Sequence, residues 1–157
     1  MFISFEGIEA SGKSTLMAAV DHALRAEGQE TLITREPGGT PAGNAVRKIF
    51  LQPGLQFNPL AETLLVNASR AQLVSDVIRP ALARGVVVLC DRYVHSTLAY
   101  QGYGRGLPID LVVYARDTLK LDRVRRIERD DPYFQKLSGD WGNALRRAFA
   151  DIDEFDI

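Results

Sequence analysis

A glycine-rich segment near the N-terminus constrains the fold more than any other feature of the chain. Residues 7–14, Gly-Ile-Glu-Ala-Ser-Gly-Lys-Ser, match the pattern GxxxxGK[ST] completely. The segment follows a short apolar run, Met1–Glu6, and leads into Lys13–Glu27, where apolar residues recur at helical spacing. Between a strand and a helix this pattern is specific for a phosphate-binding loop. An ordinary strand-to-helix turn is the alternative, and the correct flanks disfavour it.

The chemistry of each loop residue explains the pattern. Gly7 and Gly12 permit a tight turn whose amides, with the following helix N-terminus, form a cradle for phosphate oxygens. Lys13 is predicted to bridge the β- and γ-phosphates of a nucleotide donor, and the Ser14 hydroxyl to help hold Mg²⁺. The predicted ATP-binding residues are Gly7, Ile8, Glu9, Ala10, Ser11, Gly12, Lys13, Ser14 and Thr15.

Strands and helices alternate along the following sequence. The pattern predicts strands at Thr31–Thr34 and Val86–Cys90, a helix at Ala42–Leu51, and a long helix at Pro59–Arg84 that bends or restarts at Pro80. The uniformly apolar Val86–Cys90 is typical of a central parallel strand covered on both faces. Strands separated by helices predict a parallel sheet with ligands at its carboxyl ends. We expect one domain over residues 1–157, with a three-layer α/β/α P-loop NTPase fold.

Composition excludes some classes of partner. Nineteen basic side chains nearly balance 20 acidic ones, so no global positive field indicates a nucleic-acid or membrane partner. The single cysteine, Cys90, permits no intrachain disulfide, which suits a reducing cytosol. Its expected role is that of a small buried apolar side chain. No apolar run approaches the length needed to cross a bilayer. We therefore expect a cytoplasmic protein.

Further motifs distinguish among P-loop proteins. A GTPase needs a guanine-reading NKxD element, and the nearest candidate, Leu119–Asp122, has leucine where asparagine is required. Two other motifs stand out: Thr-Arg-Glu-Pro-Gly-Gly-Thr at residues 34–40, and Asp-Arg-Tyr at 91–93 with Ser-Thr-Leu-Ala-Tyr-Gln-Gly at 96–102. With the phosphate loop and residues 61–73, they make the chain similar to the bacterial type of the thymidylate kinase family. The resemblance runs from Met1 to about Leu119.

The resemblance implies phosphoryl transfer from MgATP to dTMP, giving dTDP and ADP. It implies that Arg35 and Arg92 clamp the acceptor phosphate, since a planar guanidinium can bind phosphate in bidentate fashion. It implies that Asp91, at the tip of the buried strand, organises Mg²⁺ together with Ser14. Surface ion pairs for the two arginines, and a capped turn for the aspartate, are the alternatives. The catalytic residues that it implies are Lys13, Arg92 and Glu36.

The resemblance also implies how the nucleoside is held. Glu9 would accept a hydrogen bond from the 3′-hydroxyl, and Arg70 and Gln101 would hydrogen-bond the thymine edge. Tyr100 would pack by the sugar and disfavour a 2′-hydroxyl, with plain packing as its alternative. The implied dTMP-binding set is Glu9, Arg35, Glu36, Pro37, Val66, Arg70, Arg92, Ser96, Tyr100 and Gln101. A homodimer, formed through the long helix around Glu62 to Leu82, is also implied.

Two departures from the family pattern bear on function. Val66 stands where the family typically places an aromatic residue against thymine, so ring stacking is lost there. After Leu119 no further strand or following helix is recognisable, which leaves open whether the sheet lacks one strand of the usual five. Residues 120–138 are basic and lid-like, and 150–157 form an acidic tail expected to fray. The candidate lid arginines are Arg123, Arg125, Arg126 and Arg129, with a solvated charged face as the alternative.

Three functional interpretations follow from these departures. The leading one is a dTMP kinase with an altered lid half. A kinase for another deoxynucleoside monophosphate is favoured by Val66. A noncatalytic nucleotide-binding remnant would keep the phosphate loop without a working lid.

Overall fold

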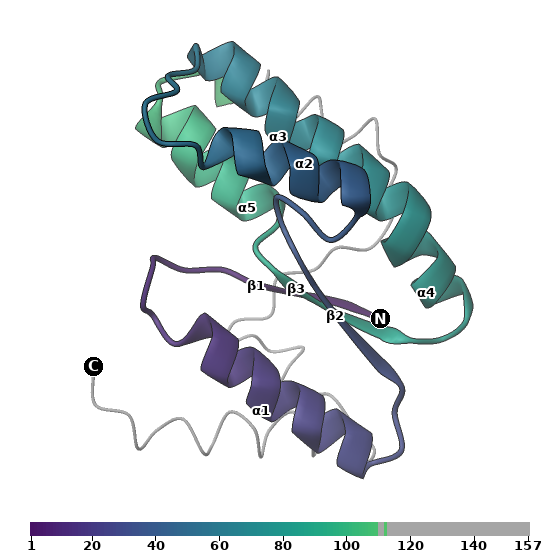
Figure 1. The fold of residues 1–157 in the computed structure, drawn as a ribbon. Coiled ribbons are helices and arrows are strands. Elements are labelled where there is room, and N and C mark those ends of the chain that lie inside the picture. The colour runs from purple at the N-terminus through teal and green to yellow at the C-terminus, as the bar shows by residue number, and fades with distance from the viewer. Residues whose placement is uncertain (110–111, 113–157) are drawn as a thin grey trace.

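A buried strand, β3 (Val87–Asp91), occupies the middle of the sheet in the computed structural model, which describes residues 1–109 and 112. It pairs in parallel with β1 (Phe2–Phe5) on one side and β2 (Thr31–Arg35) on the other, giving the order β1-β3-β2 among the described strands (Figure 1). The predicted parallel sheet and the central place of the apolar strand are confirmed.

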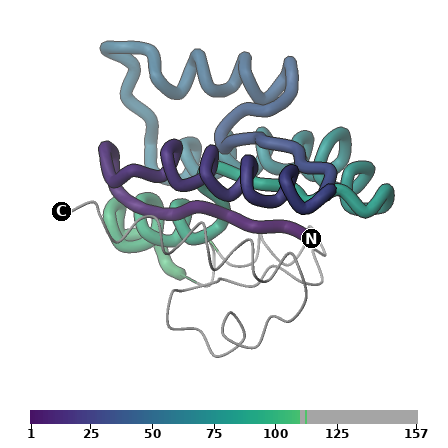
Figure 2. Tube along the Cα trace, turned by 90° about the horizontal axis from the view of Figure 1, so that it is seen from below, coloured from purple at the N-terminus to yellow at the C-terminus, as the bar shows by residue number. Residues whose placement is uncertain are grey.

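Alternate residues of β3 enter two separate cores. Val87 and Leu89 pack with α1 (Lys13–Ala26), while Val88 and Cys90 face the helices on the opposite side. Figure 1 shows α1 below the sheet and α2 (Pro41–Phe50) and α3 (Pro59–Leu73) above it. Figure 2 gives the same arrangement from below, with β1 running beside α1. The predicted three-layer α/β/α fold is therefore confirmed.

The helices begin where the sequence supplies caps. The Thr40 hydroxyl accepts a hydrogen bond from Gly43 N at 2.9 Å, and Pro41 takes the first position of α2. Asn58 Oδ1 accepts from Leu60 N at 2.9 Å, with proline again in the first position of α3. In each case the side-chain acceptor satisfies one of the free amides at the helix start, and proline in the first position has no N–H to leave unpaired.

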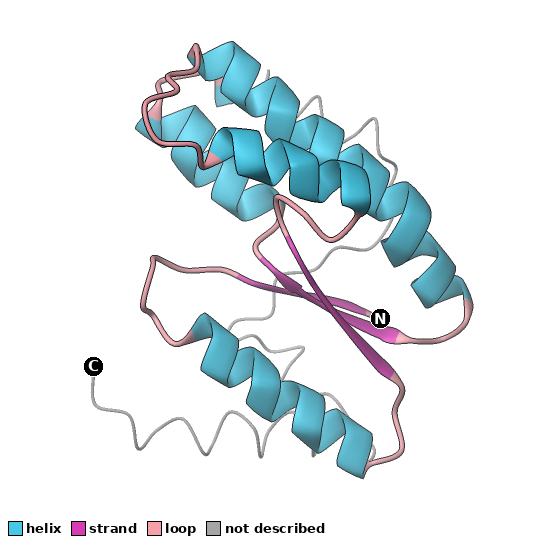
Figure 3. Ribbon diagram, in the orientation of Figure 1, coloured by secondary structure: helices cyan, strands magenta, loops and turns pink. Residues whose placement is uncertain are grey.

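The predicted long helix over Pro59–Arg84 is confirmed as a helical run of three parts. α3 passes into a π-helical stretch, η1 (Val74–Ile78), and then into α4 (Arg79–Ala83), as Figure 3 shows by its unbroken helical colouring. The disturbance lies before Pro80 and not at it. Proline has no N–H to donate to the carbonyl four residues earlier, so the preceding turn widens to π spacing.

Two short elements complete the described chain. α5 (Val94–Thr97) follows β3 and continues into a second π-helical stretch, η2 (Leu98–Gly104). Residues 110–111 and 113–157 lie outside the described residues. The question of a missing strand, the lid at 120–138 with its four arginines, and the tail at 150–157 also lie outside them.

The helices of the described residues include none that is long and apolar enough to span a bilayer.

The buried thiol gives a test of the fold. Cys90 is fully buried, and burial raises the pKa of its thiol well above the ordinary value. Because the thiolate is the reactive form, we expect no reaction of the folded protein with a chromogenic disulfide reagent at pH 8. In denaturant the reagent should detect the chain's one thiol. Rapid labelling of the folded protein would contradict the central position of β3.

Candidate functional site

The phosphate-binding loop joins β1 to α1. Gly12 stands at the N-cap of α1 with φ 79°, a left-handed conformation that favours glycine. Lys13 Nζ donates to the carbonyl oxygens of Gly7 at 3.1 Å and Ile8 at 2.6 Å, so it lies across the loop. A cavity of about 470 Å³ opens here. Its lining comprises Glu9, Ala10, Ser11, Gly12, Lys13, Ser14, Thr15, Arg47, Asp91 and Arg92.

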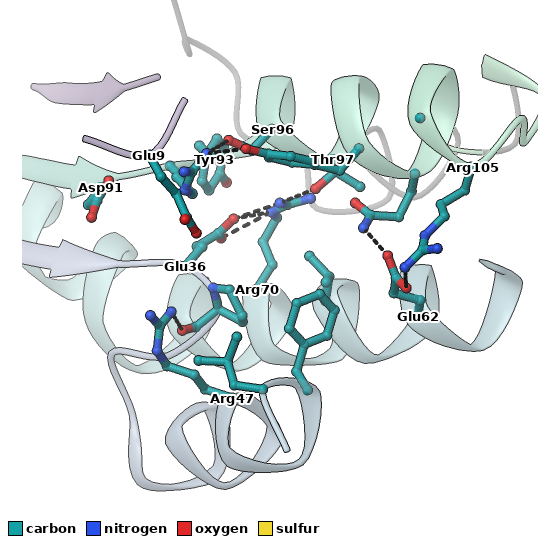
Figure 4. A pocket seen from close by; sticks show the side chains of 18 residues that line it. Glu9, Glu36, Arg47, Glu62, Arg70, Asp91, Tyr93, Ser96, Thr97 and Arg105 are labelled. Carbon is teal, nitrogen blue, oxygen red and sulfur yellow. Dashed lines mark hydrogen bonds and ion pairs between the residues drawn. The ribbon is translucent and has the colours of Figure 1, made fainter. Parts of the chain in front are cut away.

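A second cavity, also of about 470 Å³, lies over the carboxyl ends of the strands between α2, α3, α5 and η2 (Figure 4). All but one of the residues predicted to bind an acceptor nucleotide contribute to its wall: Glu9, Glu36, Pro37, Val66, Arg70, Arg92, Ser96, Tyr100 and Gln101. Arg35 is the exception. It is exposed at the end of β2 and lies outside the lining of both cavities.

The two cavities meet at a common wall. Glu9, Arg47, Asp91 and Arg92 line both of them. Strand register explains part of this, because Asp91 pairs with Phe5 on one side and with Arg35 on the other, so the three strand ends lie level. A ligand bound at the phosphate loop and a ligand in the second cavity would face each other across these four side chains.

A buried ion pair forms the floor of the second cavity. Arg70 Nη2 lies 2.6 Å from Glu36 Oε2, and Arg70 Nε donates to both oxygens of the same carboxylate at 3.0 and 2.8 Å. The side chains are only 2% and 3% exposed. Thr97 Oγ1 and Asn67 Oδ1 accept two more N–H groups of Arg70. Burial raises the pKa of the Glu36 carboxyl, and the Arg70 guanidinium opposes that rise.

Arg92 has an unusual backbone conformation. Its φ of 69° is uncommon for a residue with a side chain and carries a conformational cost. Two hydrogen bonds hold the turn: Arg92 N donates to Phe5 O at 3.0 Å, and Tyr93 N donates to Glu6 Oε1 at 2.8 Å. The guanidinium then donates to Ser96 Oγ and to Tyr100 Oη, each at 3.3 Å. The turn from β3 therefore directs Arg92 into the wall between the cavities.

Positive charge gathers around this wall. Arg47 Nη1 donates to Pro37 O at 3.1 Å, which places the guanidinium beside the loop after β2. Burial lowers the pKa of Arg47, and the neighbouring charges of Arg35 and Arg92 lower it further, while Asp91 opposes them. The Arg47 guanidinium is thus close enough to interact with those of Arg35 and Arg92, and an anion held beside it would relieve this repulsion.

Asp91 fits a role in holding a cation. Its Oδ1 is buried and has no hydrogen-bond partner among the described residues, and the side chain lines the phosphate-loop cavity together with Ser14. A carboxylate oxygen and a hydroxyl are hard ligands of the kind that Mg²⁺ prefers. Within residues 1–109 and 112, no three histidine, cysteine, aspartate or glutamate side chains group as a metal site.

Part of the lining of the second cavity is apolar. Val66 from α3 and Phe50 and Leu51 from the end of α2 contribute to it. Gln101 also lines the cavity, and its Nε2 donates to Glu62 Oε1 at 2.6 Å. A cavity with apolar and amide groups in its wall can accommodate a flat heterocycle.

Sequence reasoning missed several residues that line or support the site: Glu6, Arg47, Phe50, Glu62 and Arg105. A charged residue at the end of an apolar strand could have indicated Glu6 as a site residue. Glu62 stood in a recognised motif without an assigned role. Arg47 and Phe50 carry no local signal, because only the packing of α2 on α3 brings them to the cavity.

The Glu36–Arg70 pair gives a prediction about stability. Arg70→Met should lower the free energy of unfolding by about 3–5 kcal/mol, because it leaves a buried carboxylate without its counter-ion. The double variant Arg70→Met/Glu36→Leu should lose less than the single variant, because neither buried charge remains. Urea denaturation at pH 7 measures both losses. If the loss in the double variant equals the sum of the losses in the two single variants, Glu36 and Arg70 are not coupled.

Comparison with known proteins identifies the family. Residues 5–124 match the family model described as thymidylate kinase. The thymidylate kinase of Deinococcus radiodurans is 55% identical over 112 residues, which cover 71% of this chain and 54% of that protein. The thymidylate kinase of Halothermothrix orenii is 44% identical over 152 residues, covering 89% of this chain and 73% of that protein. The chain thus spans only about half the length of some relatives that it matches.

A solved structure agrees with the sequence comparison. The crystal structure of thymidylate kinase from Ehrlichia chaffeensis matches with a TM-score of 0.71 and 34% identity, over 98% of this chain and 86% of that one. The match confirms the resemblance that the three sequence motifs indicate. On the family model, the relatives and the fold together, this chain belongs to the thymidylate kinase family.

Proposed function

We propose that this chain transfers the γ-phosphoryl group of ATP to the phosphate of dTMP, giving ADP and dTDP. The common wall of the two cavities supports this most directly. ATP at the phosphate loop and dTMP in the second cavity would meet at Arg47, Asp91 and Arg92, where the reacting phosphates need to be aligned. Membership of the thymidylate kinase family supports the choice of substrates.

The chemistry asks for alignment and charge stabilisation. The acceptor is already a phosphate oxyanion, so no strong general base is needed. Two anions must be brought together and the charge of a loose transition state offset. Lys13 would stabilise the charge on the transferred phosphoryl group from the phosphate loop, and Arg92 would do so from the acceptor cavity. Glu36 would act through Arg70, which it holds in place.

The acceptor nucleotide would lie lengthwise in the second cavity. Its phosphate would face Arg92 and Arg47, with Arg35 approaching from the end of β2. Tyr100, whose ring centroid lies 5.4 Å from Arg92 Cζ, would border the sugar near Glu9. The base would reach Arg70, Gln101, Val66 and the ring of Phe50.

Mg²⁺ would be held by Ser14 and Asp91 together with the phosphates of ATP. When bound, it neutralises phosphate charge and orients the donor. The unpartnered, buried Oδ1 of Asp91 supports its part in this site.

Two further proposals concern the assembly and its location. Leu60 and Leu64 on α3 are 43% and 61% exposed and lie one helical turn apart, which supports a homodimer formed through this helix. A cytoplasmic location would give the enzyme access to nucleotide substrates.

Substrate turnover tests the proposed reaction. With purified, folded protein, ATP and Mg²⁺, we expect ADP formation with dTMP as acceptor, and less with dUMP, dGMP or dCMP. Lys13→Ala should lower kcat by about 10²–10³-fold, because it removes a charge that stabilises the transition state. Lys48→Ala, at an exposed position of α2 outside both cavities, is the control.

Other outcomes separate the alternatives. If turnover is faster with another deoxynucleoside monophosphate, that nucleotide and not dTMP would be the substrate. Nucleotide binding without turnover would leave a noncatalytic nucleotide-binding protein as the better account.

Sedimentation tests the homodimer. Wild-type protein should sediment at about twice the mass of the chain, and Leu64→Glu should shift the equilibrium towards monomer because it places a charge in an apolar contact. Gln29→Glu adds the same charge at an exposed position away from α3 and should leave the mass unchanged. A monomeric wild-type protein at micromolar concentration would contradict the proposal.

A further inference from the structure

We propose that Glu62 is a positioning residue that fixes the amide orientation of Gln101 and so sets which nucleobase edge the second cavity accepts. The inference rests on the proposed function, because it takes the base to lie against Gln101. It assigns a task to a carboxylate that touches neither phosphate in the proposed reaction.

The geometry around Glu62 is well defined. The side chain is only 7% exposed, and its Oε2 accepts a hydrogen bond from Arg105 Nη2 at 3.0 Å. Its Oε1 accepts from Gln101 Nε2 at 2.6 Å. Figure 4 shows Glu62 on α3 reaching across to the opposite wall, with one dashed line to Arg105 and another to the neighbouring amide.

This contact decides which way the amide points. An ionised carboxylate can only accept hydrogen bonds, so the NH₂ group of Gln101 must turn towards Glu62. The carbonyl oxygen of that amide then remains, within the described residues, as an acceptor for a ligand in the cavity. Arg105 supplies the counter-charge that a buried carboxylate needs.

Arg70 supplies the complementary donor. Glu36, Thr97 and Asn67 occupy four of its N–H groups through the bonds described above. A guanidinium has five, so one Nη1–H remains. Both residues line the second cavity, so the remaining N–H of Arg70 can serve one ligand as a donor and the carbonyl of Gln101 can serve it as an acceptor.

This pair matches one class of pyrimidine. Thymine and uracil present a carbonyl acceptor at C4 beside an N3–H donor, which is the complement of the protein groups. Cytosine presents the reverse, an amino donor beside an N3 acceptor. A ligand that leaves buried donors or acceptors of the protein without a partner, or faces donor with donor, binds much more weakly. The fixed amide of Gln101 thus selects a 4-oxo pyrimidine.

The test compares dTMP with dCMP. Dissociation constants are measured by calorimetry for wild-type protein and Glu62→Gln, and initial rates are measured alongside. Wild-type protein should prefer dTMP. In Glu62→Gln the amide at position 62 can also donate, so Gln101 can turn over, and the dTMP/dCMP preference should fall by about tenfold or more. Glu30→Gln removes a charge at an exposed site and should leave the preference unchanged.

The readout distinguishes positioning from a structural role. If Glu62 merely supported the cavity, its replacement would weaken the binding of dTMP and dCMP alike. An unchanged dTMP/dCMP preference would therefore overturn the inference. Glu62→Asp is the second variant, for use if Glu62→Gln does not fold. It keeps the charge but shortens the reach to Gln101, so its preference should also fall, and no change there would equally overturn the inference.

The same data separate this inference from the proposed reaction. Turnover of dTMP with a preference that Glu62→Gln leaves intact would defeat only the role of Glu62. Selective dTMP binding that Glu62→Gln abolishes, without any turnover, would support the role of Glu62 and defeat the proposed phosphoryl transfer. A wild-type protein that binds neither nucleotide would defeat both.

Discussion

The parallel pairing of β3 with both of its neighbours is the interaction on which the rest of the structure depends. It aligns Phe5, Asp91 and Arg35 at one edge of the sheet. The phosphate loop follows β1, the turn with Arg92 follows β3, and Glu36 follows β2. The helices on the two faces bury the strand from both sides. Polar groups that lie far apart in the sequence therefore converge at the carboxyl edge.

Above that edge, buried polar contacts tie the layers together. Arg70 on α3 binds Glu36 after β2 and Thr97 in α5, so one guanidinium joins three segments. Glu6 at the end of β1 accepts from Tyr93 N and from Ser96 Oγ, which anchors the turn that carries Arg92. Such contacts cost desolvation, but fully paired they favour a single arrangement of the cavity wall.

Sequence reasoning predicted most of the described elements because their signals are local, but it assigned no helix to α5 or η2. The apolar run of β3, the glycines of the phosphate loop and the proline-led helices need no tertiary information. It did not predict that Glu62 reaches Gln101 across 39 residues of chain, or that Arg47 and Phe50 arrive through the packing of α2 on α3. Sequence spacing shows which residues share a face of a helix. It does not show which other element packs against that face, because this depends on the whole fold.

The wall common to the two cavities has a thermodynamic consequence. Arg47 and Arg92 border both spaces, so an anion in either one would interact with the same two guanidiniums. Filling one cavity leaves less uncompensated charge to attract an anion to the other, and by linkage the effect is equal in both directions. We therefore expect the two anions to weaken each other's binding in the ground state through these shared guanidiniums. In the proposed reaction, the same guanidiniums would neutralise the transition-state charge on the transferred phosphoryl group.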